Sequence, residues 1–567
     1  MTVLIITAIL ILIPIKYVLL SFSMDKPSTL DDYHVASHRI KPINFINSSV
    51  AYGLQVAALT LFATWGYQYG IWVIWVPLFW LLGYVLLGWL IKRGVLDDII
   101  VSDDTDTVHG FIGSRLSRSL TYVASIISLI AIIGTAMYEA DFAGSFATEI
   151  LFKAANYEAS DQAVFNLKTA LFALIVLVAA SYMIVAGFKA VVFTDTIQLF
   201  IGLVAFSAVI SLLAIKLSFV GFLASSLSLL IAATILLVAL SYYWHLQNIP
   251  GSHVVAGIRV NWLFPALLVV FVIGIGVSLV IGYNDVSKQA ADPFQLNTPF
   301  NLGYGLLFNL LVANVFYQLV DVGQYQRLIS VETNHSELEQ TRSLLANANL
   351  TVGLYSAFSW VLAIFFGILL KMYFFSAEVD AYSIIIEFAV SLLDDGVLGI
   401  TIVSLLLITI LSLAFSSLDS YIAGISFTVD KDIASRIVKG TSLIRPRVTT
   451  ALLMIAGFVL ISYLFPYLKQ KHGIEYAAEF LYLCWAFQIS LLPLVLGALF
   501  RVRLSGIEYF LALAAGMTGA LIPFFKDVYL VYESSAWGAA LGSMGVFATF
   551  ILIRKFASTW AKRGIES

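Results

Sequence analysis

The sequence predicts an all-α membrane protein that crosses the bilayer about fifteen times, and three observations lead to this fold class. Hydrophobic residues make up 60% of the 567 residues and charged residues only 11%, with a mean hydropathy of +0.95, far from the values of a soluble domain. Fifteen apolar stretches approach the roughly 20 residues that span a bilayer. The single cysteine, Cys484, excludes an intrachain disulfide and a multi-cysteine metal site.

The fifteen expected spans cover residues 2–22, 44–70, 71–90, 120–150, 165–186, 191–215, 222–246, 262–283, 302–325, 344–374, 397–426, 448–467, 476–500, 507–525 and 536–553. With the N-terminus outside, the segments on the cytoplasmic side hold most of the 31 Lys and Arg residues. This bias predicts a cytoplasmic C-terminus, because basic residues stay on that side. Residues 1–12 hold no Lys or Arg, so we expect a retained first helix and not a signal peptide. The expected location is the cell inner (plasma) membrane, as a multi-pass protein.

Polar residues interrupt the second and the fourth span. Gly53 and Gln55 stand together in span 44–70, and a glycine beside a polar residue is where a membrane helix can unwind and expose backbone carbonyls. The alternative is that Gly53 only permits close helix packing. Glu139 and Asp141 lie in span 120–150, deeper than a loop boundary explains. They either line an outer vestibule or mark where that helix emerges.

The sixth and the ninth span also carry polar side chains. Asp195, in the first turns of span 191–215, is either a partner for the helix dipole or a cation ligand. Asn314, Gln318 and Asp321 follow one another at i, i+4 and i+7, so they form one stripe that faces the bundle interior or a water-filled path. The alternatives are amides that join neighbouring helices and an ion pair of Asp321 with Arg327 at the helix end.

The eleventh span sets Ser416, Ser417, Asp419 and Ser420 inside an otherwise apolar helix. Burying hydroxyls and a carboxylate in hydrocarbon is costly unless a polar or cationic group meets them. Ser416 and Ser420 are one helical turn apart, so the hydroxyls can share one face. That face can hold a small, hard cation.

Four separated motifs stand in order along the chain: Asp31–Pro42 (DDYHVASHRIKP), Gly187–Gln198 (GFKAVVFTDTIQ), Asp321–Arg327 (DVGQYQR) and Ser416–Ile433. Together they resemble the sodium/solute symporter family, which includes the bacterial proline permease and the sodium/glucose cotransporters. The resemblance covers roughly residues 31–503. It implies a leucine-transporter-type fold, in which two inverted five-helix repeats surround a midplane site formed by broken first and sixth core helices.

The resemblance also divides the chain, which forms one transmembrane domain over residues 1–567. An N-terminal helix and loop (1–43) precede the first repeat (44–215), and the second repeat (302–500) precedes the C-terminal helices (501–567). An added apolar pair within 222–283 departs from the family pattern, and we expect it to be peripheral to the transport core. An alternative alignment places the sixth core helix at residues 240–251, but that segment lacks the Gln-Arg ending.

The family's principal sodium site implies five oxygen ligands here, a set that suits a hard cation. They are the hydroxyls of Ser416 and Ser417 and the backbone carbonyls of Leu413, Gly53 and Val56. Members with a second sodium imply a second set: Asp195, Asp419 and Ser420. The implied solute pocket is lined by Gln55, Tyr138, Glu139, Asn314 and Gln318. Amides serve carboxylates, amines and hydroxyls alike, so the solute class stays open.

The expected function is a sodium-coupled symporter that imports a small polar organic solute, an amino acid or a related metabolite, by alternating access. Its partners would be the solute, Na⁺ and membrane lipid, with no nucleic acid, and it would not be an enzyme. The chain lacks a GxxxxGK[ST] phosphate loop, which argues against an ATP-driven pump. One alternative is a proton-coupled carrier in which Asp195 and Asp419 share a proton. Another is a membrane sensor that has kept the transporter fold.

Overall fold

The computed structural model describes residues 2–22, 24–100, 107–157, 160–217, 304–332, 338–374, 383–435, 443–472, 477–526 and 530–563. Among these residues, ten helices, or eleven when one bent pair counts as a single span, are long and apolar enough to cross a membrane. The chain is therefore an all-α, polytopic membrane protein. The expected spans 222–246 and 262–283 lie outside the described residues, so their predicted peripheral position is not tested.

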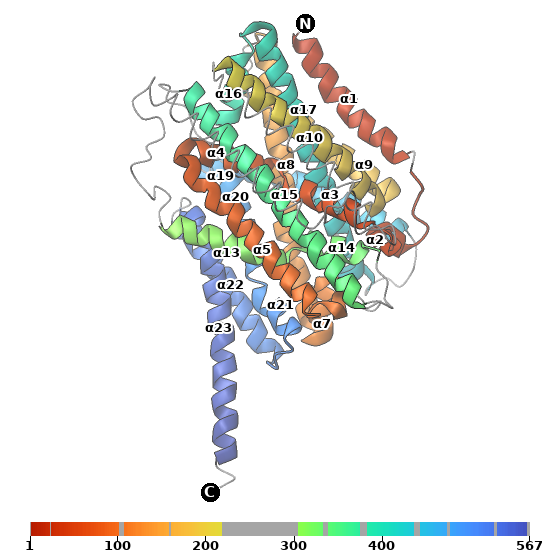
Figure 1. Cartoon of the computed structure of the whole chain (residues 1–567), viewed down its shortest axis with the longest axis vertical. Coiled ribbons are helices and arrows are strands. Elements are labelled where there is room, and N and C mark those ends of the chain that lie inside the picture. Colours follow the sequence, from red (N-terminus) through yellow and green to blue (C-terminus); the bar gives the residue numbers. More distant parts are fainter. Residues whose placement is uncertain are drawn as a thin grey trace, which may run out of the picture.

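Most expected spans coincide with helices, whose bounds follow in chain order (Figure 1). They are α1 (Thr2–Phe22), α2 (Leu30–Val35), α3 (Pro42–Gly53), α4 (Val56–Tyr69), α5 (Trp75–Lys92), α6 (Asp97–Ile100), α7 (Val108–Arg115), α8 (Arg118–Ala154), α9 (Asp161–Ala186), α10 (Phe188–Lys216), α13 (Tyr304–Val320), α14 (Val322–Ser330), α15 (Leu338–Tyr373), α16 (Ile384–Leu392), α17 (Gly396–Thr428), the π-helical turn η5 (Val429–Ala434), α19 (Ile444–His472), α20 (Ala477–Ile489), α21 (Leu492–Leu499), α22 (Gly506–Lys526) and α23 (Leu530–Arg563).

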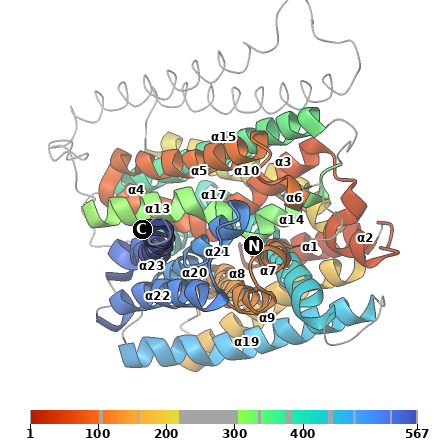
Figure 2. The same cartoon turned by 90° about the horizontal axis from the view of Figure 1, so that it is seen from below.

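Helix α17 lies at the centre of the bundle, where α8 and α10 pack along it. Every residue from Thr409 to Thr428 on this helix is buried. On another side, α15 packs along α4 and α5, and α13 packs along α5 (Figure 2). Helix α23 packs against α22, and its C-terminal part extends beyond the body (Figure 1).

Two helices are broken inside the core. The first break separates α3 from α4, where Gln55 is extended (φ −78°, ψ 159°), as the pairing of Gly53 with Gln55 predicts. The second separates α13 from α14 at Asp321, with a bend of 42°. Each break leaves backbone N–H and C=O groups without helical partners, so both places can bind polar ligands in the middle of the bundle.

Small residues bring the first broken helix against α15. Gly66 on α4 lies against the backbone of Ile364, and Gly367 on α15 lies against the backbone of Ala63. A larger side chain at either glycine would collide with main-chain atoms, so the two helices approach at a distance that only small residues allow. This close contact fixes the position of α15 side chains relative to the break in α3 and α4.

Candidate functional site

The carboxylate of Glu139 lies at the first helix break. It accepts hydrogen bonds from the backbone N–H groups of Val56 (2.8 Å) and Ala57 (3.0 Å), the first two residues of α4, and from the Ser417 hydroxyl (2.9 Å). A helix N-terminus carries unpaired N–H groups and a partial positive charge, so the carboxylate caps α4. Glu139 is fully buried, and no Lys, Arg or His side chain in the described part of the chain forms an ion pair with it.

Further oxygen atoms gather at the same place. The Ser417 hydroxyl also lies 2.8 Å from the backbone carbonyl of Leu413, one turn earlier on α17, and its single hydrogen is shared between this carbonyl and Glu139. The carbonyl of Gly53, the last residue of α3, accepts a hydrogen bond from the indole N–H of Trp360 on α15 (3.0 Å). The Ser417 hydroxyl, the Leu413 carbonyl and the Glu139 carboxylate thus converge on the start of α4, at Val56. This oxygen-rich cluster is named the break site below.

Ser416 belongs to a different cluster, around Asp195 on α10. The carboxylate of Asp195 accepts hydrogen bonds from the hydroxyls of Ser416 (2.6 Å) and Ser48 (2.5 Å). The guanidinium of Arg327 pairs with the same carboxylate at 3.3 Å. Arg327 and Asp195 are both buried, so the negative charge that the sequence leaves open as a cation ligand has a cationic partner within the protein.

Arg327, on α14, connects α3, α10 and α17 through the contacts of its guanidinium. It donates to the hydroxyls of Ser420 (2.5 Å) and Ser48 (3.0 Å), and its guanidinium carbon lies 4.4 Å from the ring centroid of Tyr52. The alternative interpretation, an ion pair of Asp321 with Arg327, is wrong, because Arg327 pairs with Asp195 instead. Asp321 caps α14 by accepting from the backbone N–H of Gly323 (2.9 Å) and also accepts from the Tyr52 hydroxyl (2.9 Å).

Asp419 lies beside the Asp195 cluster on α17. Its carboxylate accepts from the hydroxyls of Tyr182 (2.7 Å), Thr194 (3.2 Å) and Ser420 (3.3 Å). The three residues expected to form a second sodium site, Asp195, Asp419 and Ser420, therefore lie together. The guanidinium of Arg327 is among them, bonded to two of the three.

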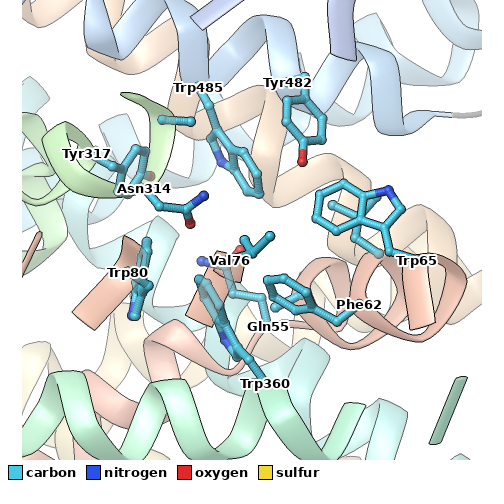
Figure 3. Close-up of a pocket in the computed structure, with 13 residues that line it drawn as sticks. Gln55, Phe62, Trp65, Val76, Trp80, Asn314, Tyr317, Trp360, Tyr482 and Trp485 are labelled. Carbon is cyan, nitrogen blue, oxygen red and sulfur yellow. The ribbon is translucent and has the colours of Figure 1, made fainter. Parts of the chain in front are cut away.

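A cavity lies next to the break site, between α4, α5, α13, α15 and α20 (Figure 3). Its volume is about 510 Å³ when the open space that continues from the cavity is included. The lining residues are Gln55, Ala58, Leu61, Phe62, Trp65, Val76, Trp80, Ala313, Asn314, Tyr317, Trp360, Tyr482 and Trp485. The sequence spacing explains the lining, because residues 58, 61, 62 and 65 share one face of α4 and residues 482 and 485 share one face of α20. No Lys, Arg, His, Asp or Glu lines the cavity among the described residues.

Seven aromatic side chains form a closed ring around this cavity. Each ring centroid lies within 6.2 Å of the next, in the order Phe62, Trp65, Tyr482, Trp485, Tyr317, Trp80 and Trp360, and the last returns to Phe62 at 4.4 Å. This set is called the aromatic ring below. Figure 3 shows its members around the side chains of Gln55 and Val76.

The residues expected to bind the solute fall in different places. Gln55 and Asn314 line the cavity. Tyr138, Glu139 and Gln318 are not among the lining residues: the Tyr138 hydroxyl lies 3.2 Å from that of Thr60 and Glu139 caps α4. Both amide atoms of Gln318 are buried without a hydrogen-bond partner in the described part of the chain.

No family model matches the chain, and no curated protein matches its sequence. A solved structure of a Na⁺-coupled sialic acid symporter, in a substrate-bound, outward-open state, matches with a TM-score of 0.63. The match covers 96% of this chain and 97% of that one, at 15% sequence identity. The two chains share one fold. At this identity, the likeness establishes the fold and leaves ligands and coupling to be argued from the residues.

A polar cluster connects α2 with η5, on the side predicted as cytoplasmic. Asp430 pairs with His34 (3.0 Å) and with Arg445 (2.6 Å), and Lys431 pairs with Asp31 (2.9 Å). Burial lowers the pKa of His34, although its hydrogen bond to Asp430 acts in the opposite direction. These residues are called the α2–η5 clamp below.

A second carboxylate extends the contacts of η5 to α7 and α8. Asp432 accepts from the hydroxyls of Thr107 (2.6 Å) and Ser125 (3.1 Å) and lies 2.9 Å from the ring Nδ1 of His109. Asp430 and Asp432 are both buried. The end of the central helix is therefore fixed to α2, α7, α8 and α19 through polar contacts.

Sequence reasoning missed Ser48, Arg327 and Tyr182 as members of the buried polar clusters. Arg327 was visible as a basic residue near the end of a span, a position that usually means a lipid-facing or solvent charge. The aromatic ring was also missed, because its members come from five helices and each looks like an ordinary apolar residue in its own span. Spans 44–70 and 476–500 hold one tryptophan each, Trp65 and Trp485, so neither span carried a local signal.

Proposed function

We propose that the chain is a Na⁺-coupled symporter that moves a small polar organic solute across the membrane by alternating access. The fold shared with a Na⁺-coupled symporter supports this proposal. Two broken helices meet the buried polar clusters, an arrangement suited to ion and solute binding at the middle of a membrane. Burying polar groups inside the membrane costs free energy, so a helix bundle without a binding or transport role would have no use for them.

The observation that carries the proposal is the unmatched charge of Glu139. This carboxylate is fully buried and receives three hydrogen bonds, from two N–H groups of α4 and one hydroxyl, with no basic partner in the described residues. Hydrogen bonds compensate only part of the cost of burying a charge. A small cation beside the carboxylate would compensate the rest, and the oxygens of Ser417 and Leu413 are suitable ligands for Na⁺.

The break site also joins ion binding to solute binding. Gly53, Gln55 and Val56 are almost consecutive, yet they contact three different parts of the site: Trp360, the cavity and Glu139. A cation that shifts the break by even a small distance moves Gln55 and the Trp360 contact as well. Coupling in this account is the difference in solute affinity between the two positions of the break.

We propose further that one Na⁺ is used per cycle. The guanidinium of Arg327 already bonds Asp195 and Ser420, so a positive charge occupies the region that the resemblance gives to a second Na⁺. A second cation there would face repulsion from a buried guanidinium, which keeps its charge at every physiological pH. A Hill coefficient near one for Na⁺ is the expected result.

Thermal unfolding of the purified protein tests the proposal without knowledge of the solute. NaCl is titrated against KCl at constant total salt and constant pH, because only a specific ligand stabilises the folded state in a saturable way. We expect saturable stabilisation by Na⁺ and none by K⁺. Equal melting temperatures in the two salts across the whole titration would refute sodium coupling.

A proton-coupled carrier is the second candidate, and Glu139 is the observation that favours it, because a proton would neutralise this buried carboxylate as well as a cation does. The two functions differ in one measurement. Stabilisation that depends on pH and is insensitive to Na⁺ at each pH supports the proton carrier. Stabilisation by Na⁺ at fixed pH supports the symporter.

A further inference from the structure

The aromatic ring dominates the chemistry of the cavity. Seven of the 13 lining residues are aromatic, and only Gln55 and Asn314 carry a side-chain amide. Apart from Trp485, the ring members are at most 7% exposed, so the faces of the rings lie in a largely dry space. Aromatic faces carry partial negative charge and attract cations, most strongly where water is excluded.

The orientations of the rings favour a rounded group over a flat one. Neighbouring planes are inclined by 40° for Trp80 and Trp360, 33° for Phe62 and Trp360, and 61° for Tyr482 and Trp485. A planar solute would need two parallel faces about 7 Å apart, twice the ordinary contact distance between carbon atoms. Most neighbouring rings are tilted against one another, so the lining consists of ring faces and ring edges at several angles.

The polar atoms of the cavity are few and neutral. The indole N–H groups of Trp80 and Trp485 are buried without a hydrogen-bond partner in the described residues. Asn314 uses its amide N–H to bond the Leu310 carbonyl (2.7 Å), which leaves its side-chain oxygen for a ligand. A sugar needs a hydrogen-bond partner for each hydroxyl, and a primary ammonium needs acceptors for three N–H groups. The acceptors of the cavity are the amide oxygens of Gln55 and Asn314 and the hydroxyls of Tyr317 and Tyr482, and no lining carboxylate in the described residues balances the charge of a primary ammonium.

We propose that the transported solute carries a quaternary ammonium group, held inside the aromatic ring, and a short tail with an oxygen acceptor. This inference rests on the proposed function, because it names the solute of the same symporter. The methylated cation has no N–H group to satisfy, so aromatic faces are its natural partners. The tail, a carboxylate or a hydroxyl, accepts hydrogen bonds from Gln55 and from the free indole N–H groups.

A methylation series tests this solute class on the purified full-length protein. Glycine, N-methylglycine, N,N-dimethylglycine and glycine betaine differ only in the methyl groups on nitrogen, and choline carries the same cation with a hydroxyl tail. Binding is measured by thermal shift and by tryptophan fluorescence, in NaCl and in KCl. We expect affinity to rise along the series, with at least tenfold tighter binding of a quaternary ammonium than of glycine in NaCl. The relative affinities of glycine betaine and choline then show whether the tail is a carboxylate or a hydroxyl.

An uncharged analogue separates a cation effect from simple apolar burial. In 3,3-dimethylbutyrate a carbon atom replaces the nitrogen of glycine betaine, so shape is kept and the positive charge is lost. We expect at least tenfold weaker binding of this analogue. Equal affinities would overturn the proposal, and so would tighter binding of uracil or another flat heterocycle than of both quaternary ammonium probes.

Two tryptophans on α5 provide a matched pair of variants. Trp80→Leu removes one face of the aromatic ring, and Trp80→Tyr keeps a face there. Trp89 lies on the same helix but is 51% exposed and outside the cavity, so Trp89→Leu is the control. We expect at least tenfold loss in Trp80→Leu, partial recovery in Trp80→Tyr and wild-type affinity in Trp89→Leu. Equal affinity of Trp80→Leu and Trp89→Leu would overturn the assignment of the cation to the ring.

The outcomes for ion and solute are distinguishable. If Na⁺ stabilises the protein but no quaternary ammonium probe binds, the solute class is wrong and the symporter proposal stands. If a quaternary ammonium probe binds equally in NaCl and KCl, and Na⁺ itself has no effect, the solute class is right and sodium coupling is wrong. K⁺ serves as the reference cation because choline is itself a probe.

Discussion

Replacing Glu139 by Gln should abolish most Na⁺ binding while leaving the fold intact. The amide oxygen of Gln can still accept from the N–H of Val56 (2.8 Å), whereas its NH₂ group takes the place of the oxygen that accepts from Ala57 (3.0 Å), and the negative charge is lost. Two unit charges 4 Å apart interact by about 4 kcal/mol at an effective dielectric constant of 20. Because Na⁺ must also lose its hydration, we expect about two-thirds of this to remain, a loss of about 2.7 kcal/mol or roughly 100-fold in affinity.

The assay is thermal unfolding across a NaCl titration against KCl. At a Na⁺ concentration 100 times the wild-type dissociation constant, ligand linkage stabilises the wild type by about 2.7 kcal/mol and a 100-fold weaker variant by about 0.4 kcal/mol. In KCl alone, the stability of Glu139→Gln should stay close to that of the wild type, because the hydrogen bond lost at Ala57 offsets the gain from burying no charge. A Na⁺ affinity within twofold of the wild type would refute the role of Glu139.

Four further predictions concern the remaining polar contacts. Ser417→Ala should weaken Na⁺ binding about tenfold, or about 1.4 kcal/mol, in the same titration; unchanged affinity would remove this hydroxyl from the site. Asp195→Asn should lower the free energy of unfolding, measured in denaturant, by about 3 kcal/mol, because Arg327 stays buried without its anion. The double variant with Arg327→Met should recover part of this loss. Full stability of the single variant would show that the ion pair is not needed. Trp360→Phe keeps an aromatic face but loses the N–H group that bonds the broken helix. Solute affinity in KCl should therefore stay within about twofold, while the increase in solute affinity caused by Na⁺ should become smaller. An unchanged increase would argue against coupling through this contact. Asp430→Asn should weaken the α2–η5 clamp and speed amide hydrogen exchange in residues 30–35, and wild-type exchange rates there would contradict a clamp.

Much of the helical framework follows from the sequence because span length and apolarity are local properties. The first span was expected at 2–22, and α1 runs over Thr2–Phe22. The break beside Gly53 was one of two interpretations that the residues left open, the other being close helix packing, because a glycine near an amide is a local signal for both. The expected span 476–500 is two helices, α20 and α21, and the second begins with Pro493 in its first turn, where proline is favoured.

Tertiary partners were harder to predict than helices. Glu139 was noticed as a polar residue in a span, but its partners at Val56 and Ser417 come from two distant helices. Ser416 and Ser417 are adjacent, yet they point to different carboxylates, because consecutive residues on a helix are turned by about 100° from one another. The partner of Arg327 is 132 positions away in the chain, a separation that no local pattern reveals.

Equilibrium binding of ²²Na⁺ to the purified protein tests the central claim most directly, because it needs no knowledge of the solute. The account predicts one saturable Na⁺ per chain, displaced by unlabelled Na⁺ and not by K⁺, and lost in Glu139→Gln. It also predicts that Glu508→Gln, which removes a carboxylate from an exposed ion pair with Arg554, binds Na⁺ as the wild type does. The absence of saturable binding, or undiminished binding in Glu139→Gln, would contradict the account.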